Sequence, residues 1–461
     1  MQEGSSRAKA IVEKGRFAPP LAGLFLAAVA FGPSASAESP PRSRAPYTFT
    51  DGETLPIPDR ATDGHPFTPG SVSPYPQRRG PHTLVDLHAH AFMDRGLGIL
   101  FDGDFRSPLR STSWSDLFSS QINADTLEAS GLGLIVVSLY AHPLFAPSRQ
   151  QSIRRQIADA REFVRTHPDW VIARDPHEAR DAVARGKHVM VLSLEGASGI
   201  LDTEEDIKEL VDEDGIRIVT FAHLADDKLT GAALLPRYNV LGNPRGLVSA
   251  LVEQKRSSDG TLLNPHGLTA YGRAVASRLI AHHVWIDLAH ASEATSVALM
   301  TMMLEAGQPL LYTHMGLRAD GGPSVSDDLL RVVAGSGGIM GVVPGESITG
   351  GTQVPKENCP RECDGRCAGG IYALAAQFNQ IAGVIGEEHT FIGSDFNGAQ
   401  VHLPPSRACK TGTTLDERGF YNISQTGEFW EALRVAGARS KTNQEHGIEN
   451  FLAVWEKVYA R

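Results

Sequence analysis

Two histidines two residues apart end the first strongly apolar run of the chain. The run is LVDLHAH, residues 84–90, and it carries His88 and His90. Successive side chains of a β-strand point to opposite faces, so residues two apart lie on the same side. We therefore expect both imidazoles to point the same way from the C-terminal end of a buried strand, as the first ligands of a zinc-like ion must. Because His-x-His pairs also occur on ordinary surfaces, this interpretation depends on the rest of the chain.

Polar or ionisable residues also end most of the later apolar runs. These residues are Glu195, His223, His290, His314 and Asp395. A single histidine at a strand end is usually a hydrogen-bonded residue of the core or rim. Several such groups buried together at one rim would be costly unless something compensates their unpaired polar atoms. A pair of metal ions would provide that compensation.

Five of these residues have the chemistry of a binuclear metal site. His88 and His90 would hold one ion, and His290 and His314 would hold the second. Glu195 is suited to bridge them, because a carboxylate offers one oxygen to each cation. Two divalent ions ~3.5–4 Å apart can share a water, lower its pKa and polarise a carbonyl group. The ligand set suits zinc and also allows cobalt, iron or manganese.

The two remaining residues supply proton transfer and hydrogen bonding. Asp395 would take a proton from the bridging water and pass it to the leaving amine. His223 is not needed as a ligand, and it could donate a hydrogen bond to the developing oxyanion. The predicted reaction is the hydrolysis of an amide or a related acyl bond.

The elements that carry these residues predict an α/β fold, a (β/α)8 barrel of the TIM type. Eight apolar runs read as strands, at residues 84–90, 133–141, 188–196, 216–223, 283–290, 309–314, 337–343 and 389–396. Helical patterns lie between them, for example at residues 149–167, 202–213 and 272–282. Continuous apolar runs indicate strands buried on both faces, and eight alternations favour a barrel, whose strands bring their C-terminal ends to one rim. An open doubly wound sheet is the alternative, but no Gly-rich phosphate loop follows the first strand.

The first 37 residues have the pattern of an export signal. Four basic residues precede the apolar run LAGLFLAAVAF, residues 21–31, and Ala35-Ser36-Ala37 fits a cleavage site. The run is short for a membrane span, although an uncleaved N-terminal anchor is the alternative. We therefore expect an exported protein, periplasmic or secreted, with no membrane span after signal cleavage.

Composition sets the domain organisation that we expect. Residues 38–81 hold ten of the 28 prolines and predict an extended segment. Residues 82–461 would form one catalytic domain, with insertions at 224–282 and 344–388 over the active face. The chain of 461 residues has a formal net charge of -10 and no basic block, so nucleic acid is not an expected partner. The expected partner is a small-molecule substrate, and a homodimer is left open.

Four cysteines lie in the part of the chain that would be exported. They are Cys359, Cys363, Cys367 and Cys409. An even number in an oxidising compartment favours disulfides, with three pairings open. A structural zinc knot is the alternative, although the spacing fits no common zinc pattern.

The chain resembles the membrane (renal) dipeptidases of the amidohydrolase superfamily over nearly all of residues 82–461. The matching segments, in order, are LSLEG (192–196), IRIVTFAH (216–223), the block at 267–292, PLLYTH (309–314), GSGGIMGVV (335–343), IGSDFNG (392–398) and GIENFLAVWEKV (447–458). The block GLTAYGRAVASRLIAHHVWIDLAHAS at 267–292 is the most specific. The resemblance implies a (β/α)8 barrel, two zinc ions and dipeptidase activity. By position the resemblance assigns His88, Glu195, His290 and His314 as metal ligands and Asp395 as the acid/base. It does not assign His90, and it makes His223 a substrate contact.

Three departures from the family pattern concern the substrate more than the metals. The family has His-x-Asp in the first strand, where this chain has His90 at the last position. Pro323-Ser324 stands in place of an Arg-Asn pair that helps to hold the dipeptide carboxylate, and Arg318 is the candidate substitute for substrate binding. Asn397 replaces a second acidic residue.

These observations lead to one main hypothesis and two alternatives. The main hypothesis is an exported binuclear zinc dipeptidase. The first alternative is another reaction of the amidohydrolase superfamily, on a different small amide, an ester or a lactone. The second is a non-catalytic exported binding protein on a degenerate barrel. The presence of all expected ligands and of the acid/base Asp395 argues against this last reading.

Overall fold

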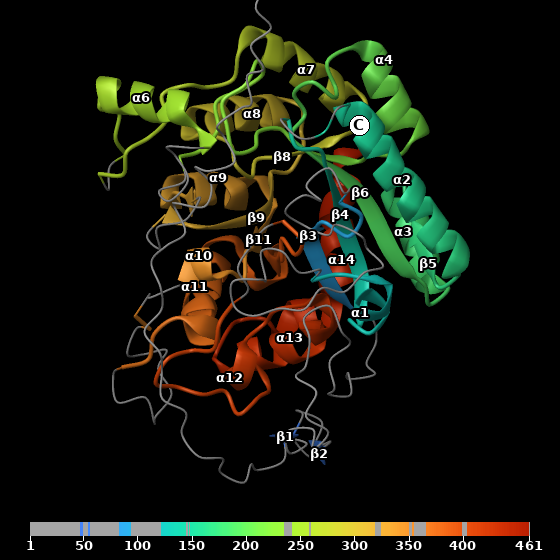
Figure 1. Cartoon of the computed structure of the whole chain (residues 1–461), viewed down its shortest axis with the longest axis vertical. Helices are drawn as coiled ribbons and strands as arrows, with labels where there is room; N and C mark the ends of the chain where they lie inside the picture. Colours follow the sequence, from blue (N-terminus) through green and yellow to red (C-terminus); the bar gives the residue numbers. More distant parts are fainter. Residues whose placement is uncertain are drawn as a thin grey trace, which may run out of the picture. The chain divides into compact units, whose positions relative to one another are not determined.

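The structure of the protein is a computed structural model (Figure 1). It describes residues 47–48, 54–55, 83–93, 121–143, 146, 148–234, 242–257, 260–318, 324–349, 353–354, 366–398 and 403–460. The expected export signal, residues 1–37, lies outside the described residues, as do Pro323, Cys359 and Cys363. In the proline-rich segment only a short antiparallel pair is described, between β1 (Tyr47–Thr48) and β2 (Thr54–Leu55).

Eight parallel strands close into a barrel. Their order around the barrel is β3 (Leu84–Ala89), β4 (Leu132–Tyr140), β6 (His188–Glu195), β7 (Ile218–Thr220), β8 (Trp285–Asp287), β9 (Leu311–Leu317), β11 (Ile339–Val342) and β12 (Thr390–Ile392). The ring closes because β12 pairs with β3. Each strand overlaps one of the eight predicted runs, although β4 begins one residue earlier and β9 continues past residue 314 to Leu317. The predicted (β/α)8 barrel is therefore confirmed.

The strands are buried on both faces, as their continuous apolar sequences require. In β4 every one of the nine residues is buried. One face of each strand fills the barrel interior and the other packs against the helices, so neither face tolerates a regular polar alternation. Two short strands extend the sheet, since β5 (Trp170–Ile172) pairs with β6 and β10 (Ser324–Val325) pairs with β9.

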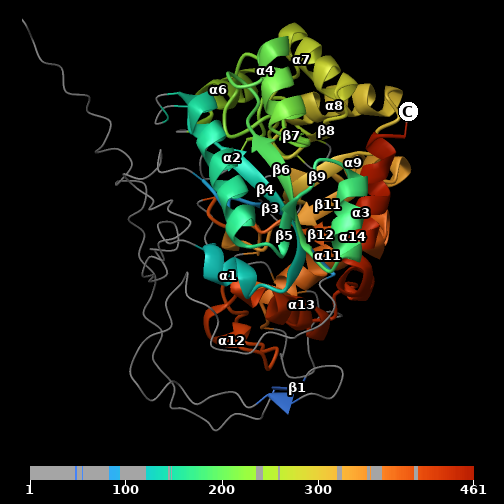
Figure 2. The ribbon, with the colours of Figure 1, turned by 90° about the vertical axis from the view of Figure 1, so that its right-hand side faces the viewer.

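Helices surround the barrel (Figure 2). Those before β8 include α1 (Ala124–Glu128), α2 (Arg149–Thr166), α3 (Pro176–Ala184), α4 (Glu204–Ile207), its π-helical continuation η4 (Lys208–Glu213), and α6 (Pro244–Glu253). The later ones are α7 (Ala270–Ala281), α8 (Glu293–Glu305), α9 (Asp327–Ser336), α10 (Glu346–Thr349), α11 (Gly370–Ile385), α12 (Leu415–Arg418), α13 (Thr426–Val435) and α14 (Lys441–Trp455). Short 3-10 turns are η7 (Glu387–His389), η8 (Ile423–Gln425) and η9 (Glu456–Val458).

Side-chain caps begin the helices that the sequence predicted. Ser148 caps α2 by accepting a hydrogen bond from the backbone N–H of Gln151, and Thr269 caps α7 in the same way. Such a cap satisfies one of the amide donors that a helix start leaves free. The helix predicted at residues 202–213 is present as α4 and η4, so its second half is wider than an α-helix.

Long connections follow β7 and β11. The first contains α6 and then α7, which leads directly into β8, and the second leads into α11 and β12. A disulfide between Cys367 and Cys409 joins the connection after β11 to the one after β12. Beside it, Ala368 and Arg407 form an antiparallel bridge. Among the described residues, no helix has both the length and the apolar character needed to cross a membrane.

Candidate metal centre

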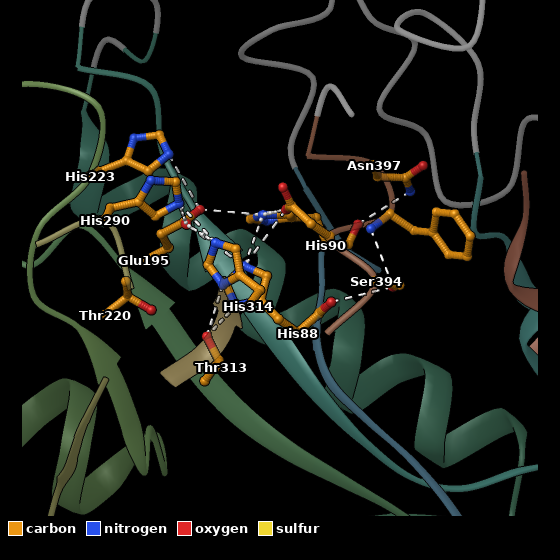
Figure 3. A network of polar contacts seen from close by, with 12 residues as sticks. His88, His90, Glu195, Thr220, His223, His290, Thr313, His314, Ser394 and Asn397 are labelled. Carbon is orange, nitrogen blue, oxygen red and sulfur yellow. Dashed lines mark hydrogen bonds and ion pairs between the residues drawn. The ribbon is translucent and has the colours of Figure 1, made fainter. Parts of the chain in front are cut away.

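The predicted ligands meet at the C-terminal rim of the barrel, around the carboxylate of Glu195 (Figure 3). Glu195 is the last residue of β6, and five imidazole groups point their Nε2 atoms toward it. The distances to Oε1 are 3.2 Å for His290, 3.5 Å for His314 and 3.7 Å for His88. The distances to Oε2 are 3.3 Å for His90 and 3.6 Å for His223.

Asp395 lies on the same rim, after β12. Its Oδ1 is 3.2 Å from Nε2 of His90 and 3.9 Å from Nε2 of His88. Its backbone N–H donates to the carbonyl of His88 at 2.8 Å, which fixes the end of β12 against β3. The barrel therefore brings together the seven residues predicted at its rim, and Arg318 is the one predicted site residue outside this cluster.

The spacing of the nitrogen atoms fits metal coordination. The two Nε2 atoms of His290 and His314 are 2.8 Å apart, and those of His88 and His90 are 3.3 Å apart. Among the residues that the structure describes, three groups have ligand atoms close enough to hold an ion: His88, His90 and Glu195; Glu195, His223 and His290; and His88, His314 and Asp395. The first group contains the three ligands proposed for one ion. The other two groups differ from the expectation, because they separate His290 from His314. They place His290 with His223 and His314 with Asp395.

An unpaired oxygen tests whether a cation fits this centre. Oε1 of Glu195 is buried and has no hydrogen-bond partner among the described residues, although three imidazole nitrogens lie within 4 Å. Burying a carboxylate oxygen without a partner is costly, and a divalent cation would satisfy it. The donor set of imidazoles and carboxylates suits zinc and related divalent metals.

Burial sets the protonation of most of the histidines. It holds the pKa of His88 and of His314 well below the usual 6.5, and it lowers the pKa of His223 to about 3. These imidazoles are therefore neutral and keep a lone pair for a metal ion. For His90, burial alone would lower the pKa, but the carboxylates of Asp395 and Glu195 raise it to about 10. A metal ion at this position would replace the His90 proton, since ligands bind in their deprotonated form.

Left-handed backbone turns aim two of the site residues. His290 has φ of 60° and Asp395 has φ of 52°, conformations that few non-glycine residues adopt. The N–H of Ala233, in the connection after β7, donates to the carbonyl of His290 at 2.7 Å. After Asp395, a Cβ at Gly398 would lie only 2.0 Å from Asp395 Oδ1, so a larger residue there would displace the Asp395 carboxylate. The long connection and the glycine thus hold these strained turns in place.

Two buried carboxylates lie below the ligands, and the sequence analysis missed both. Asp287, in β8, accepts four hydrogen bonds, from the N–H groups of Ala289 and Thr313 and from the hydroxyls of Thr220 and Thr313. Asp86, in β3, accepts from the N–H groups of His88 and Ser394 through one oxygen. Burial raises the pKa of Asp86 to about 6. The available signal was an acidic residue inside an otherwise apolar strand.

Asn397 joins the end of β12 to the segment before α1. Its Oδ1 accepts from the N–H of Gln121 at 2.6 Å, and its own N–H donates to Oε1 of Gln121 at 3.0 Å. Its Nδ2 donates to the carbonyls of His90 at 3.2 Å and Ile122 at 3.4 Å. Asn397 therefore supports the backbone of His90 and needs both its donor and its acceptor to do so.

Arg318 already has a carboxylate partner. Its guanidinium pairs with Glu293 at the start of α8, and only 8% of the Arg318 side chain is exposed. Both residues line a small pocket with Ala291, Tyr312 and Met315, and none of the predicted metal ligands lines it. Of the Pro323-Ser324 pair, Ser324 lies in β10 beside β9.

Comparison with known proteins gives a family match over most of the chain. The family model described as membrane dipeptidase (peptidase family M19) matches residues 82–458. A curated relative, dipeptidase 3 of Macaca fascicularis, is 30% identical over 139 residues, which is 30% of this chain and 25% of that protein. The aligned region therefore spans about a quarter of that relative's length.

Solved structures with the same fold cover nearly the whole domain. A metallopeptidase described as dipeptidase AC has a TM-score of 0.58 at 16% identity and covers 83% of this chain and 100% of its own. A metallopeptidase from Rhodobacter sphaeroides was solved with a phosphinate mimic of the dipeptide L-Ala-D-Ala. It has a TM-score of 0.57 at 16% identity, and the match covers 81% of this chain and 99% of that one. At 16% identity, this structural likeness is evidence for the shared fold alone.

Proposed function

The chain belongs to the membrane dipeptidase family, and from this premise we propose that it is an exported binuclear zinc hydrolase that cleaves the amide bond of dipeptides. The observation that carries the proposal is the convergence of five imidazole groups on the buried carboxylate of Glu195. Family membership makes the protein a metal-dependent hydrolase, and the identity and number of the ions are part of the proposal. The pattern of residues 1–37 and the Cys367–Cys409 disulfide support export.

The ligands proposed for zinc are His88, His90, Glu195, His290 and His314. Two bound zinc ions would polarise the scissile carbonyl and acidify the attacking water. The neutral state of His88 and His314 keeps their lone pairs available for such ions. Glu195 can serve both ions, because imidazoles approach each of its two oxygens.

Asp395 is the proposed acid/base. Its carboxylate faces His90 within 3.2 Å, and burial raises its pKa above the usual value. A raised pKa brings a carboxyl group closer to the working pH, where it can both accept and release a proton. Asp395 would therefore take the proton of the attacking water and deliver it to the leaving amine.

His223 is the proposed substrate contact. Its side chain is 21% exposed, whereas the other residues of the centre are 9% exposed or less. It therefore lies on the accessible side of the centre, where a substrate carbonyl would arrive. Since His223 is neutral, a ring N–H could donate a hydrogen bond to the developing oxyanion.

A second candidate function rests on the pairing of Arg318. The expected role of Arg318 is to hold the substrate carboxylate, but its guanidinium is paired with Glu293. An Arg318 that stays paired with Glu293 cannot hold a substrate carboxylate, which would favour a substrate that lacks one. This supports a different small amide, an ester or a lactone as the alternative substrate class.

The experiment uses residues 38–461, stripped of metal and reconstituted with counted zinc. The protein is assayed for release of amino acid from dipeptides with L- and D-residues at the second position, and in parallel on small esters and lactones. Zinc-dependent cleavage of dipeptides, lost on chelation, is the expected result. Two bound zinc ions with turnover of esters or lactones alone would replace the dipeptidase proposal by the second candidate. A protein that binds no zinc would contradict both.

A further inference from the structure

One hydroxyl group contacts histidines from both sides of the candidate metal centre. Thr313 lies directly before His314 in β9, and its Oγ1 is 2.8 Å from Nδ1 of His314 and 3.1 Å from Nδ1 of His88 (Figure 3). The same Oγ1 is 2.6 Å from Oδ2 of Asp287. Thr313, His88 and Asp287 are fully buried and His314 is 3% exposed, so water does not compete for these contacts.

The hydrogen-bonding capacity of a hydroxyl determines how these contacts are made. A threonine hydroxyl has one proton to donate and two lone pairs to accept with. Thr313 donates this one proton to Oδ2 of Asp287. Both lone pairs of Thr313 then accept, which requires an N–H at Nδ1 of His88 and at Nδ1 of His314. In a neutral imidazole this leaves Nε2 of each ring unprotonated, and these are the atoms that face Glu195.

We propose that Thr313 is a positioning residue that fixes the tautomers of His88 and His314 together, and so couples the two halves of the metal centre. This inference rests on the proposed metal centre. His88 belongs to the ligands proposed for one ion and His314 to those proposed for the other. Loss of the hydroxyl would leave both Nδ1 atoms without a partner and would favour protonation at Nε2, which blocks coordination. Both ions should therefore be affected by one substitution.

Thr220 offers a matched control in the neighbouring strand. It is also fully buried, it ends β7, and its hydroxyl donates to the same Oδ2 of Asp287 at 2.6 Å. Within the described part of the chain, its hydroxyl has no histidine among its hydrogen-bond partners. Replacing either threonine by valine removes one hydrogen bond to Asp287 and keeps the shape of the side chain. Only the change at Thr313 also removes the contacts to the ligands.

The test measures zinc binding by Thr313→Val, Thr313→Ser and Thr220→Val in the protein of residues 38–461. Zinc per chain is counted by mass spectrometry, and both dissociation constants are obtained by titration against a competing chelator. Partners that orient metal ligands typically contribute about 10–100-fold to metal affinity. We expect Thr313→Val to lower the zinc affinity of both sites by about this factor. Thr313→Ser, which keeps the hydroxyl, and Thr220→Val should both retain the wild-type affinities. Thermal unfolding of the metal-free proteins checks that all three fold.

The possible outcomes separate this inference from the proposed function. If the wild type binds two zinc ions and Thr313→Val binds them equally well, the inference fails and the proposed function stands. If Thr313→Val binds only one of the two ions more weakly, the proposed coupling is wrong. If Thr220→Val lowers zinc affinity as much as Thr313→Val does, the effect comes from the lost hydrogen bond to Asp287 and not from the histidines. A wild type that binds no zinc would overturn the proposed function, and this inference with it.

Discussion

Two clusters of histidine and carboxylate groups in this protein are alike in composition and differ in geometry. One is the candidate metal centre around Glu195, inside the barrel rim. The other lies on the helical layer, where His282 at the end of α7 meets two carboxylates. There Nε2 is 3.1 Å from Glu204 and Nδ1 is 3.0 Å from Asp212, so each nitrogen has its own partner.

Burial and convergence distinguish a candidate metal site from an ordinary ion pair. The His282 side chain is 24% exposed and its two partners are more exposed still, so water screens the pair and its contribution is small. At the rim, several nitrogens compete for one carboxylate, and one oxygen of Glu195 has no hydrogen bond from any described residue. The rim cluster therefore keeps a buried carboxylate oxygen that a cation would satisfy, whereas the His282 cluster does not. Residue types alone would not have separated the two.

The largest effect is expected from removing a ligand. His314→Ala should remove about one zinc ion per chain and nearly all turnover, because His314 faces both His290 and Glu195. Zinc content and the rate of dipeptide cleavage provide the measurement. Full activity with full zinc content in this variant would remove His314 from the centre.

Removing the acid/base should be nearly as severe but should spare the metal. Asp395→Asn keeps the size of the side chain and removes its ability to carry a proton. General acid–base catalysis contributes about 10²–10⁴-fold, so kcat should fall by roughly that factor with zinc content unchanged. A variant that loses zinc in proportion to activity would make Asp395 a ligand rather than the acid/base.

A smaller effect is expected from the support of His90. Asn397→Asp replaces the two N–H bonds from Nδ2 by a carboxylate oxygen that faces the carbonyls of His90 and Ile122. Asn397 has φ of 65°, a conformation that Asp tolerates about as well as Asn, so the backbone itself is not tested. We expect zinc affinity to fall about 10–100-fold, as measured by chelator titration. Unchanged affinity would show that the clamp between Asn397 and Gln121 does not support the centre.

The smallest effect is expected outside the rim. For His282, burial lowers the pKa, but Asp212 and Glu204 outweigh it and the pKa is raised above 6.5. A raised histidine pKa adds stability that is fully present below the unfolded value of about 6.5 and is lost as the pH rises through the folded pKa. His282→Gln should therefore lower the free energy of unfolding by about 0.5 kcal/mol at pH 5.5 and by less at pH 9.

This last measurement uses denaturant unfolding in the presence of a chelator, so that zinc loss at low pH does not enter. Turnover of His282→Gln at neutral pH should equal that of the wild type. A loss of zinc or of turnover in this variant would break the distinction between the two clusters.

Local sequence patterns were sufficient to predict the barrel and the residues at its rim. Each buried strand is a continuous apolar run, and a polar residue ends it where the chain reaches the rim, as Glu195 does at the end of β6. Both signals lie within a few residues of one another. The partners of these residues were beyond such reasoning, because they come from distant strands. Thr313 contacts His88 across 225 positions, and Asn397 meets Gln121 across 276.

The sequence by itself determined the fold class and the identity of the candidate ligands, because strand periodicity and strand ends are local properties. The family followed from the resemblance of ordered segments such as residues 267–292. Only the tertiary structure decided which atoms meet. Barrel closure left Oε1 of Glu195 without a hydrogen bond within the described part of the chain, placed the hydroxyl of Thr313 between two histidines, and paired Arg318 with Glu293. It also chose Cys367 and Cys409 as a disulfide pair from the open alternatives. These choices depend on distances across the barrel, which no periodicity along the chain encodes.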